Sequence, residues 1–166
     1  IKSEDEIICM KASVKTAEKG ILLMHENLKA GMTEEELWST LHKTNIENGG
    51  EWFETRLLNS GPKTNPWFQE CSSRIIQEGD IVAFDTDMVG PYGYCADISR
   101  TFVEGRKLSN YQKKIHSLAY ENVKYNEQLI KPGLSFREFA EKAWQLPDNC
   151  FDNHYPCQIH GVGMSD

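Results

Sequence analysis

The sequence predicts an α+β fold in which helices and strands occur in two similar halves. Three observations support this: two long segments carry apolar residues at helical spacing, each is followed by a glycine and a shorter capped helix, and strand-like runs lie between them. A chain of 166 residues can bury a sizeable core. We therefore expect a single domain over residues 1–166, with a first half of about 1–78 and a second half of about 79–166.

The first half begins with two predicted helices. Apolar residues recur at helical spacing from Glu4 to Lys29, and Gly31 ends this segment. Thr33 then has the character of an N-cap, with Glu36 three residues later as in a capping box. We expect the second helix to run to about Asn48.

The predicted strands follow in three runs, "WFETRLLNSG", "DIVAFDTDMVG" and "YGYCADISRTFVEG". Side chains alternate between the two faces of a strand, so Ile81, Ala83, Asp85 and Asp87 should share one face. The next strand should bring Asp97 alongside. Three carboxylates are thus expected to lie close together among apolar residues.

The second half repeats the helical pattern. The segment "LSNYQKKIHSLAYENVKYNEQLI" predicts a long helix capped by Ser109, and "KPGLSFREFAEKAW" a shorter one capped by Ser135. "KAGMTEEEL" aligns with "KPGLSFREF", which favours a duplicated half-domain, although common helix-start patterns also produce such a match by chance. In "YPCQIHGVGMSD", a strand-like segment should lead to His160, followed by a flexible Gly161–Gly163 turn.

Charge and composition argue against several classes of partner. The formal net charge of −7 disfavours a nucleic-acid partner, which would require a basic face. Apolar runs stay well short of the roughly 20 residues of a membrane span. The five cysteines show no CxxC pairing and are interpreted as reduced thiols, which suggests a cytoplasmic protein. The first residues show no signal-peptide pattern, but the chain begins with Ile, which leaves a removed targeting segment open.

The aspartates suggest a metal site. Crowded carboxylates repel one another and raise one another's pKa, and divalent metal ions offset that repulsion. Asp85, Asp87 and Asp97 with His160 offer oxygen ligands and one imidazole, a set suited to Mn, Fe, Co or Zn. The alternative is a surface hairpin whose acidic side chains are solvated.

These motifs resemble a known superfamily. "GDIVAFDTD", "GYCADISRTF" and "HGVG" are similar to the pita-bread metalloenzymes: methionine aminopeptidase, Xaa-Pro aminopeptidase, prolidase and creatinase. The resemblance implies duplicated helix–helix–strand halves around a curved, mostly antiparallel sheet. It also implies two metal ions with two further glutamate ligands on strands beyond residue 166, so the catalytic domain is expected to be incomplete in this chain.

Two departures point to one subgroup of that superfamily. The usual motif separates its two aspartates by eleven residues, whereas Asp97 follows Asp85 by twelve and Asp87 by ten. The histidine that the peptidases carry before the aspartates is replaced by a stretch containing Trp67. Both features resemble the DddP-type dimethylsulfoniopropionate lyases, as does a tyrosine, Tyr155, five residues before the HGVG histidine.

The resemblance implies a role for each residue. Asp85, Asp87, Asp97 and His160 would bind two divalent metal ions, with iron favoured and manganese, cobalt or zinc also compatible. Asp166 and Tyr155 would be catalytic, with Asp166 the general base. Trp67 and Tyr155 would bind the sulfonium group of a small-molecule substrate, or alternatively serve only in packing.

The expected function is metal-dependent cleavage of dimethylsulfoniopropionate to dimethyl sulfide and acrylate. The alternatives are a dinuclear metallopeptidase of the Xaa-Pro aminopeptidase or prolidase type, and a pita-bread binding module without catalysis. We also expect a homodimer that binds neither nucleic acid nor membrane.

Overall fold

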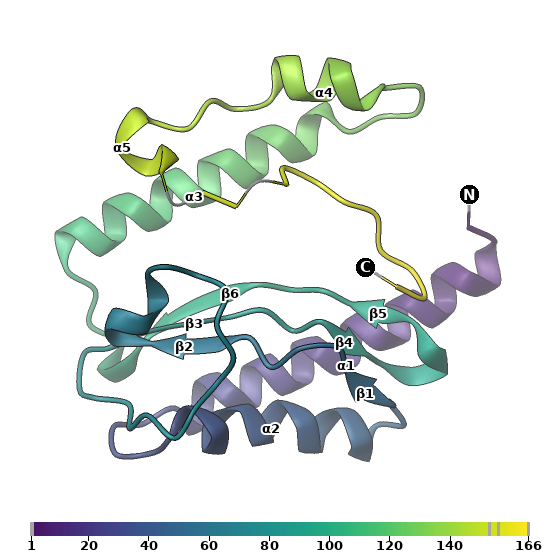
Figure 1. Ribbon diagram of the computed structural model, residues 1–166. Coiled ribbons are helices and arrows are strands. Elements are labelled where there is room, and N and C mark those ends of the chain that lie inside the picture. Colours follow the sequence, from purple (N-terminus) through teal and green to yellow (C-terminus); the bar gives the residue numbers. More distant parts are fainter. Residues whose placement is uncertain (1, 153, 156, 166) are drawn as a thin grey trace. The chain divides into compact units, whose positions relative to one another are not determined.

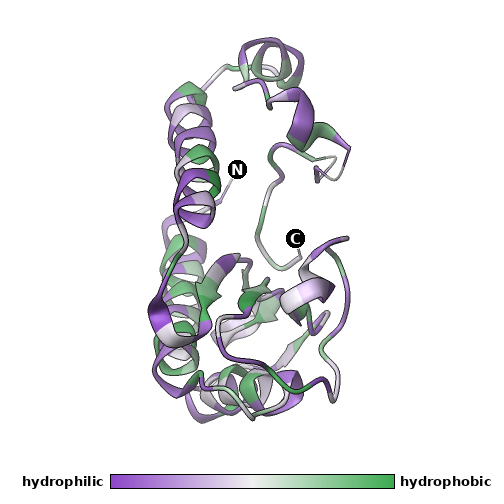
Figure 2. Ribbon diagram, turned by 90° about the vertical axis from the view of Figure 1, so that its left-hand side faces the viewer, coloured by the Kyte–Doolittle hydropathy of each residue, from purple (hydrophilic) through white to green (hydrophobic). Residues whose placement is uncertain are grey.

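The computed structural model describes residues 2–152, 154–155 and 157–165, and these form two compact units (Figure 1). The first unit contains the chain up to Lys107 and the segment that follows His160, and the second contains Leu108–His160. Hydrophobic and hydrophilic residues are interspersed along the helices (Figure 2), and in the first two, Glu4–Asn27 and Glu34–Glu47, the buried residues recur at helical spacing. In the described part of the chain, the helices lack the long apolar stretch that crossing a membrane would require.

The first unit begins with two capped helices, α1 (Glu4–Asn27) and α2 (Glu34–Glu47). In both, the N-cap hydroxyl accepts a hydrogen bond from the backbone three residues on, and the glutamate there accepts one from the N-cap backbone. For α2 these residues are Thr33 and Glu36. Both predicted helices are therefore confirmed.

The strands of the first unit form two three-stranded antiparallel sheets, with orders β1-β4-β5 and β2-β3-β6. Their bounds are β1 (Trp52–Phe53), β2 (Leu58–Ser60), β3 (Ile81–Phe84), β4 (Met88–Val89), β5 (Cys95–Ala96) and β6 (Arg100–Val103). Short 3₁₀ turns lie at η1 (Gly61–Thr64), η2 (Pro91–Gly93) and η3 (Glu104–Arg106). The three runs predicted as strands all contribute, but each is interrupted.

Helices α1 and α2 pack against these strands and bury a common apolar core (Figure 1). The helices contribute Ala17, Ile21, Met24, Leu37, Trp38 and Leu41, and the strands contribute Phe53, Leu58, Val82, Phe84, Met88 and Ala96. This core fixes the strands that carry the three aspartates.

The second unit contains α3 (Asn110–Leu129), α4 (Phe136–Lys142) and the short α5 (Asp148–Phe151). Ser109 and Ser135 cap α3 and α4 as predicted. The helix–glycine–helix arrangement thus occurs in both units, with Gly31 and Gly133 at positive φ of 92° and 85°. Duplication of the strands stays a prediction.

The strand predicted before His160 is wrong. The described residues from 154 to 160 contain no strand. A strand requires a neighbouring strand to pair its backbone groups. Alternating apolar residues alone therefore do not produce a strand here.

Candidate metal centre

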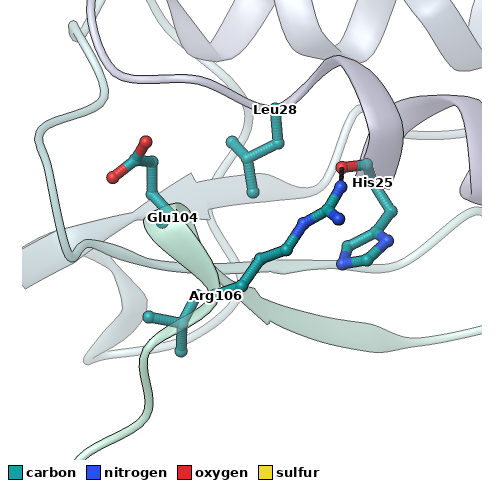
Figure 3. Close-up of a pocket in the computed structure, with 6 residues that line it drawn as sticks. His25, Leu28, Glu104 and Arg106 are labelled. Carbon is teal, nitrogen blue, oxygen red and sulfur yellow. Dashed lines mark hydrogen bonds between the residues drawn. The ribbon is translucent and has the colours of Figure 1, made fainter.

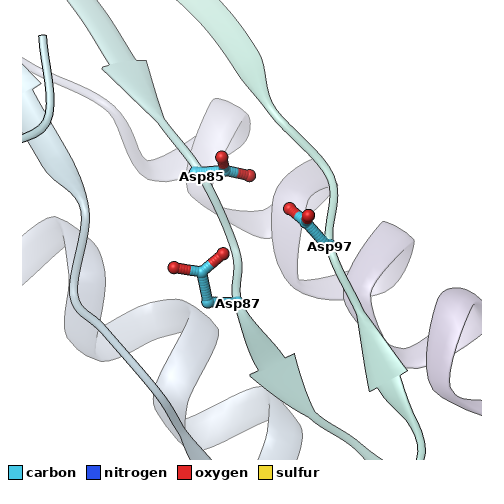
Figure 4. A group of neighbouring side chains, drawn as sticks. All are labelled: Asp85, Asp87 and Asp97. Atoms are coloured by element: carbon cyan, nitrogen blue, oxygen red, sulfur yellow. The ribbon is translucent and has the colours of Figure 1, made fainter. Parts of the chain in front are cut away.

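Three carboxylates converge in the first unit, as the sequence predicted. Asp85, Asp87 and Asp97 each offer an oxygen, and these oxygens lie within 4.8 Å of one another. Asp85 and Asp87 come from the segment that joins β3 to β4, and Asp97 comes from the adjacent segment that joins β5 to β6 (Figure 4). All three are half-buried. The arrangement is compatible with a shared cation.

Strand alternation explains why the two aspartates of "DTD" share a face. From Ile81 to Met88 every second residue is buried, and the residues between are half-buried. Asp85 and Asp87 occupy the half-buried face, while Thr86 points into the protein and is fully buried. The alternation of side chains along a strand was therefore sufficient to predict that Asp85 and Asp87 share a face.

The aspartates occupy the interruption between the two sheets. Asp85 and Asp87 lie between β3 and β4, and Asp97 lies between β5 and β6. The backbone of Asp87 has a φ of 34°, outside the extended conformation of a strand. The pleat is broken at the point where the carboxylates meet.

Two threonines that the sequence reasoning missed support the carboxylates. Thr55 donates a hydrogen bond to Asp87 Oδ2. The Thr86 hydroxyl donates to the carbonyl of Ala96 and accepts from the backbone N–H of Ile98, 2.9 Å away, so it binds both neighbours of Asp97. Alternation already predicted that Thr86 is buried, and a buried hydroxyl needs partners, so a signal for it was present.

The electrostatics of the cluster fit a divalent cation. Three half-buried carboxylates within 4.8 Å repel one another when ionised. Hard oxygen donors at this spacing match Mn, Fe, Co or Zn with additional ligands. The residues present therefore fit the metal that the sequence predicted, and its identity stays a prediction.

The segment after His160 belongs to the first unit and is tied to the strand that precedes Asp97. The backbone N–H of Cys95 in β5 donates to the carbonyl of Gly163, 2.6 Å away. The Gly163 N–H in turn donates to the carbonyl of Ser165, 2.9 Å away. His160 itself closes the second unit, so its role as a ligand stays a prediction.

Two further site residues were predicted, Asp166 and Tyr155. Asp166, the predicted base, lies outside the described residues. Tyr155 lies in the second unit, where it lines an open groove with Phe139, Trp144 and Ile159. Its catalytic and substrate-binding roles stay predictions.

Trp67 lies half-buried on a loop that a buried glutamate anchors. Glu34, whose side chain is 0% exposed, accepts hydrogen bonds from Ser60, Lys63 and Ser72. Burial alone would raise the pKa of Glu34, but these partners hold it below its usual value. The loop between Ser60 and Ser72 is therefore fixed at both ends, while contact of Trp67 with a substrate stays a prediction.

A small pocket at the end of α1 contains none of the predicted site residues. It is lined by His25, Leu28, Glu104 and Arg106, among others (Figure 3). Arg106 donates to the carbonyl of His25 at 3.4 Å. Glu104 accepts from the backbone N–H groups of Ala30 and Gly79, at 3.1 and 3.0 Å. These hydrogen bonds connect neighbouring turns, which gives the residues around the pocket a structural role.

Comparison with known proteins identifies the family. The chain matches metallopeptidase family M24 over residues 8–166, and it belongs to this family. It is 42% identical to a dimethylsulfoniopropionate lyase DddP of Roseovarius nubinhibens, over 100% of this chain and 39% of the relative. It is 38% identical to a DddP lyase of Roseobacter denitrificans, over 100% of this chain and 38% of that protein.

Solved structures agree with the family. A putative aminopeptidase P from Bacillus anthracis is similar with a TM-score of 0.86 and 27% identity, over 99% of this chain and 42% of that one. An Xaa-Pro dipeptidase from the same organism gives a TM-score of 0.81 and 25% identity, over 99% and 47%. The α+β, pita-bread-like fold and the resemblance to this superfamily are confirmed. The chain spans about two fifths of the length of its curated lyase relatives.

Proposed function

We propose that the protein is a metal-dependent lyase that cleaves dimethylsulfoniopropionate to dimethyl sulfide and acrylate. The similarity to DddP lyases over the whole of this chain, at 42% and 38% identity, carries the proposal. The converging aspartates of the "DTD" motif support it, because they supply the carboxylate cluster that a metal-dependent reaction requires. The proposal concerns the full-length protein.

In this proposal Asp85, Asp87, Asp97 and His160 hold the metal ions, two in number, with iron favoured. When bound, the metals would neutralise the substrate carboxylate and acidify the adjacent C–H. The assignment of His160 rests on the resemblance of "HGVG" to the motif of this superfamily.

Asp166 would act as the general base. It would accept the proton from the carbon next to the substrate carboxylate. The electron pair of that C–H bond then forms the C=C bond of acrylate, and the C–S bond breaks with its electrons passing to sulfur. Dimethyl sulfide leaves as a neutral molecule, and no oxidant or reductant is needed.

Trp67 and Tyr155 would present aromatic faces to the dimethylsulfonium cation. A cation over an aromatic face gains about 0.5–2 kcal/mol, more when the contact is desolvated. This interaction would orient the leaving group without taking part in bond cleavage.

The second candidate is a dinuclear metallopeptidase that acts on Xaa-Pro substrates. The structural similarity to an Xaa-Pro dipeptidase, with a TM-score of 0.81, favours it. The absence from the sequence of a histidine between Asn59 and Arg74 weighs against it, because the resemblance implies one there in peptidases. A binding module without catalysis is less compatible with the assembled aspartates.

The deciding experiment measures both reactions on the purified full-length protein. Headspace gas chromatography should detect dimethyl sulfide released from dimethylsulfoniopropionate, and an assay with Xaa-Pro dipeptides should show little hydrolysis. Brisk dipeptide hydrolysis without dimethyl sulfide would instead establish the peptidase. A protein inactive in both assays while fully metal-loaded would favour the binding module. Cytoplasmic location and a homodimer remain predictions beside this one.

A further inference from the structure

We infer that Thr86 is a positioning residue that sets the location of Asp97 relative to Asp85 and Asp87, and thereby controls the affinity of the cluster for metal. The inference rests on the proposed metal site. Thr86 is 0% exposed and stands between two of the three aspartates in the sequence. Its hydroxyl contacts backbone groups of Ala96 and Ile98, the two neighbours of the third aspartate.

The register of the strands shows that Thr86 lies in a break between two ladders. Phe84 pairs with Arg100 at the end of one ladder, and Met88 pairs with Ala96 at the start of the other. Three residues therefore separate the two ladders on each strand. Asp85, Thr86 and Asp87 lie on one strand, and Ser99, Ile98 and Asp97 lie opposite them in that order. The two strands stay in register across the break, and Thr86 lies opposite Ile98.

A single side chain bridges this break. The Thr86 hydroxyl donates to the carbonyl before Asp97 and accepts from the N–H after it. Both peptide groups that flank Asp97 are thus fixed to one atom on the strand that carries Asp85 and Asp87. The aspartates can leave the regular ladder to converge, because the hydroxyl supplies hydrogen bonds across the gap.

This arrangement matters for metal binding because ligand distances tolerate deviations of only about 0.2 Å. Groups that orient ligands through hydrogen bonds typically contribute about 10- to 100-fold in metal affinity. Thr55 steadies the Asp87 carboxylate directly, whereas Thr86 acts through the backbone on either side of Asp97. Loss of its hydroxyl should therefore weaken the site without removing a ligand.

The test compares Thr86→Val with Thr86→Ser in the full-length protein. Valine keeps the volume and loses both hydrogen bonds, and serine keeps the hydroxyl. The matched control is Thr44→Val, because Thr44 is also buried, at 2% exposed, and its hydroxyl donates to the Thr40 carbonyl of its own helix. Each chelator-stripped protein is titrated with Co²⁺, by calorimetry and by the visible absorption of the bound ion, after circular dichroism establishes folding.

Thr86→Val should bind Co²⁺ about 10- to 100-fold more weakly than wild type, with an altered visible spectrum. Thr86→Ser should restore both, and Thr44→Val should match wild type. If Thr86→Val does not fold, Thr86→Ala against Thr86→Ser gives the same comparison of one hydroxyl. Wild-type affinity and spectrum in a folded variant without the hydroxyl would overturn the inference.

The outcomes also distinguish the role of Thr86 from the proposed metal site and the proposed lyase activity. A wild-type protein that binds no Co²⁺ would refute the metal site and the role of Thr86 together. A wild-type protein that binds Co²⁺ but releases no dimethyl sulfide would refute the lyase alone, and the affinity comparison would still decide the role of Thr86.

Discussion

Replacing Glu34 by glutamine should strongly destabilise the first unit, although the change is nearly isosteric. Glu34 Oε1 accepts from the backbone N–H and the hydroxyl of Ser60, both at 2.8 Å. Oε2 accepts from Lys63 Nζ at 2.8 Å and from the backbone N–H and hydroxyl of Ser72 at 3.0 and 2.7 Å. Whichever oxygen becomes the amide nitrogen, a backbone N–H then faces another donor.

The magnitude follows from these contacts. A hydrogen bond to a charged group contributes about 1.5–3 kcal/mol, and at least one backbone donor would be left unsatisfied. Removing one partner of a buried ion pair costs about 3–5 kcal/mol. Lys63 is 26% exposed, so it stays partly solvated and the lower end applies. We expect a loss of about 3 kcal/mol in the free energy of unfolding.

Urea unfolding, followed by the fluorescence of tryptophan, measures this loss in the full-length protein at neutral pH. Trp38 lies in the core of the same unit, at 2% exposed, and should report its unfolding. Glu35→Gln is the matched control: it is the next residue of α2, it is exposed, and it makes the same change in charge. That control should shift stability by less than about 0.5 kcal/mol.

The pH dependence gives an independent check. The folded-state pKa of Glu34 lies below the value of 4.5 for an unperturbed glutamate, so the folded protein favours the ionised form. The stabilisation is present above the unfolded pKa and lost as pH falls through the folded pKa. The difference in the free energy of unfolding between wild type and Glu34→Gln should therefore decrease as the pH falls below 4.5. A loss below about 1 kcal/mol at neutral pH, when about 3 is expected, would refute this reasoning.

Three further predictions concern the site and α2. Asp166→Asn should keep its metal content and lose about 10²- to 10⁴-fold in turnover, whereas Asp87→Ala should lose metal and activity together. Metal analysis and turnover rates of both variants test this. A rate above about a tenth of wild type for Asp166→Asn would exclude Asp166 as the general base. Stripping with EDTA should abolish dimethyl sulfide release and added Fe²⁺ or Mn²⁺ should restore it, while undiminished release by metal-free protein would contradict a metal-dependent reaction. Thr33→Ala should cost about 1 kcal/mol in urea unfolding, since it removes the N-cap of α2; an unchanged midpoint would show that the cap contributes nothing.

The sequence determined the local features of this protein. Helix starts at Thr33, Ser109 and Ser135 were predictable because a capping hydroxyl and its N–H partner lie within one turn. The shared face of Asp85 and Asp87 was predictable because strand periodicity acts over neighbouring residues. Family membership followed from motifs that the sequence displays directly.

Only the tertiary structure decided features that depend on residues far apart in the chain. The strand expected before His160 did not form among the described residues, and strand pairing depends on the position of other segments, which the local sequence does not determine. The break between the sheets is bridged by Thr86, whose partners follow it by ten and twelve residues on another strand. The sequence assigns no role to Glu34 in the first turn of α2, yet folding surrounds it with donors from Ser60, Lys63 and Ser72. Burial and hydrogen bonding of this kind arise only when distant segments meet, so their energetic roles become visible only in the folded chain.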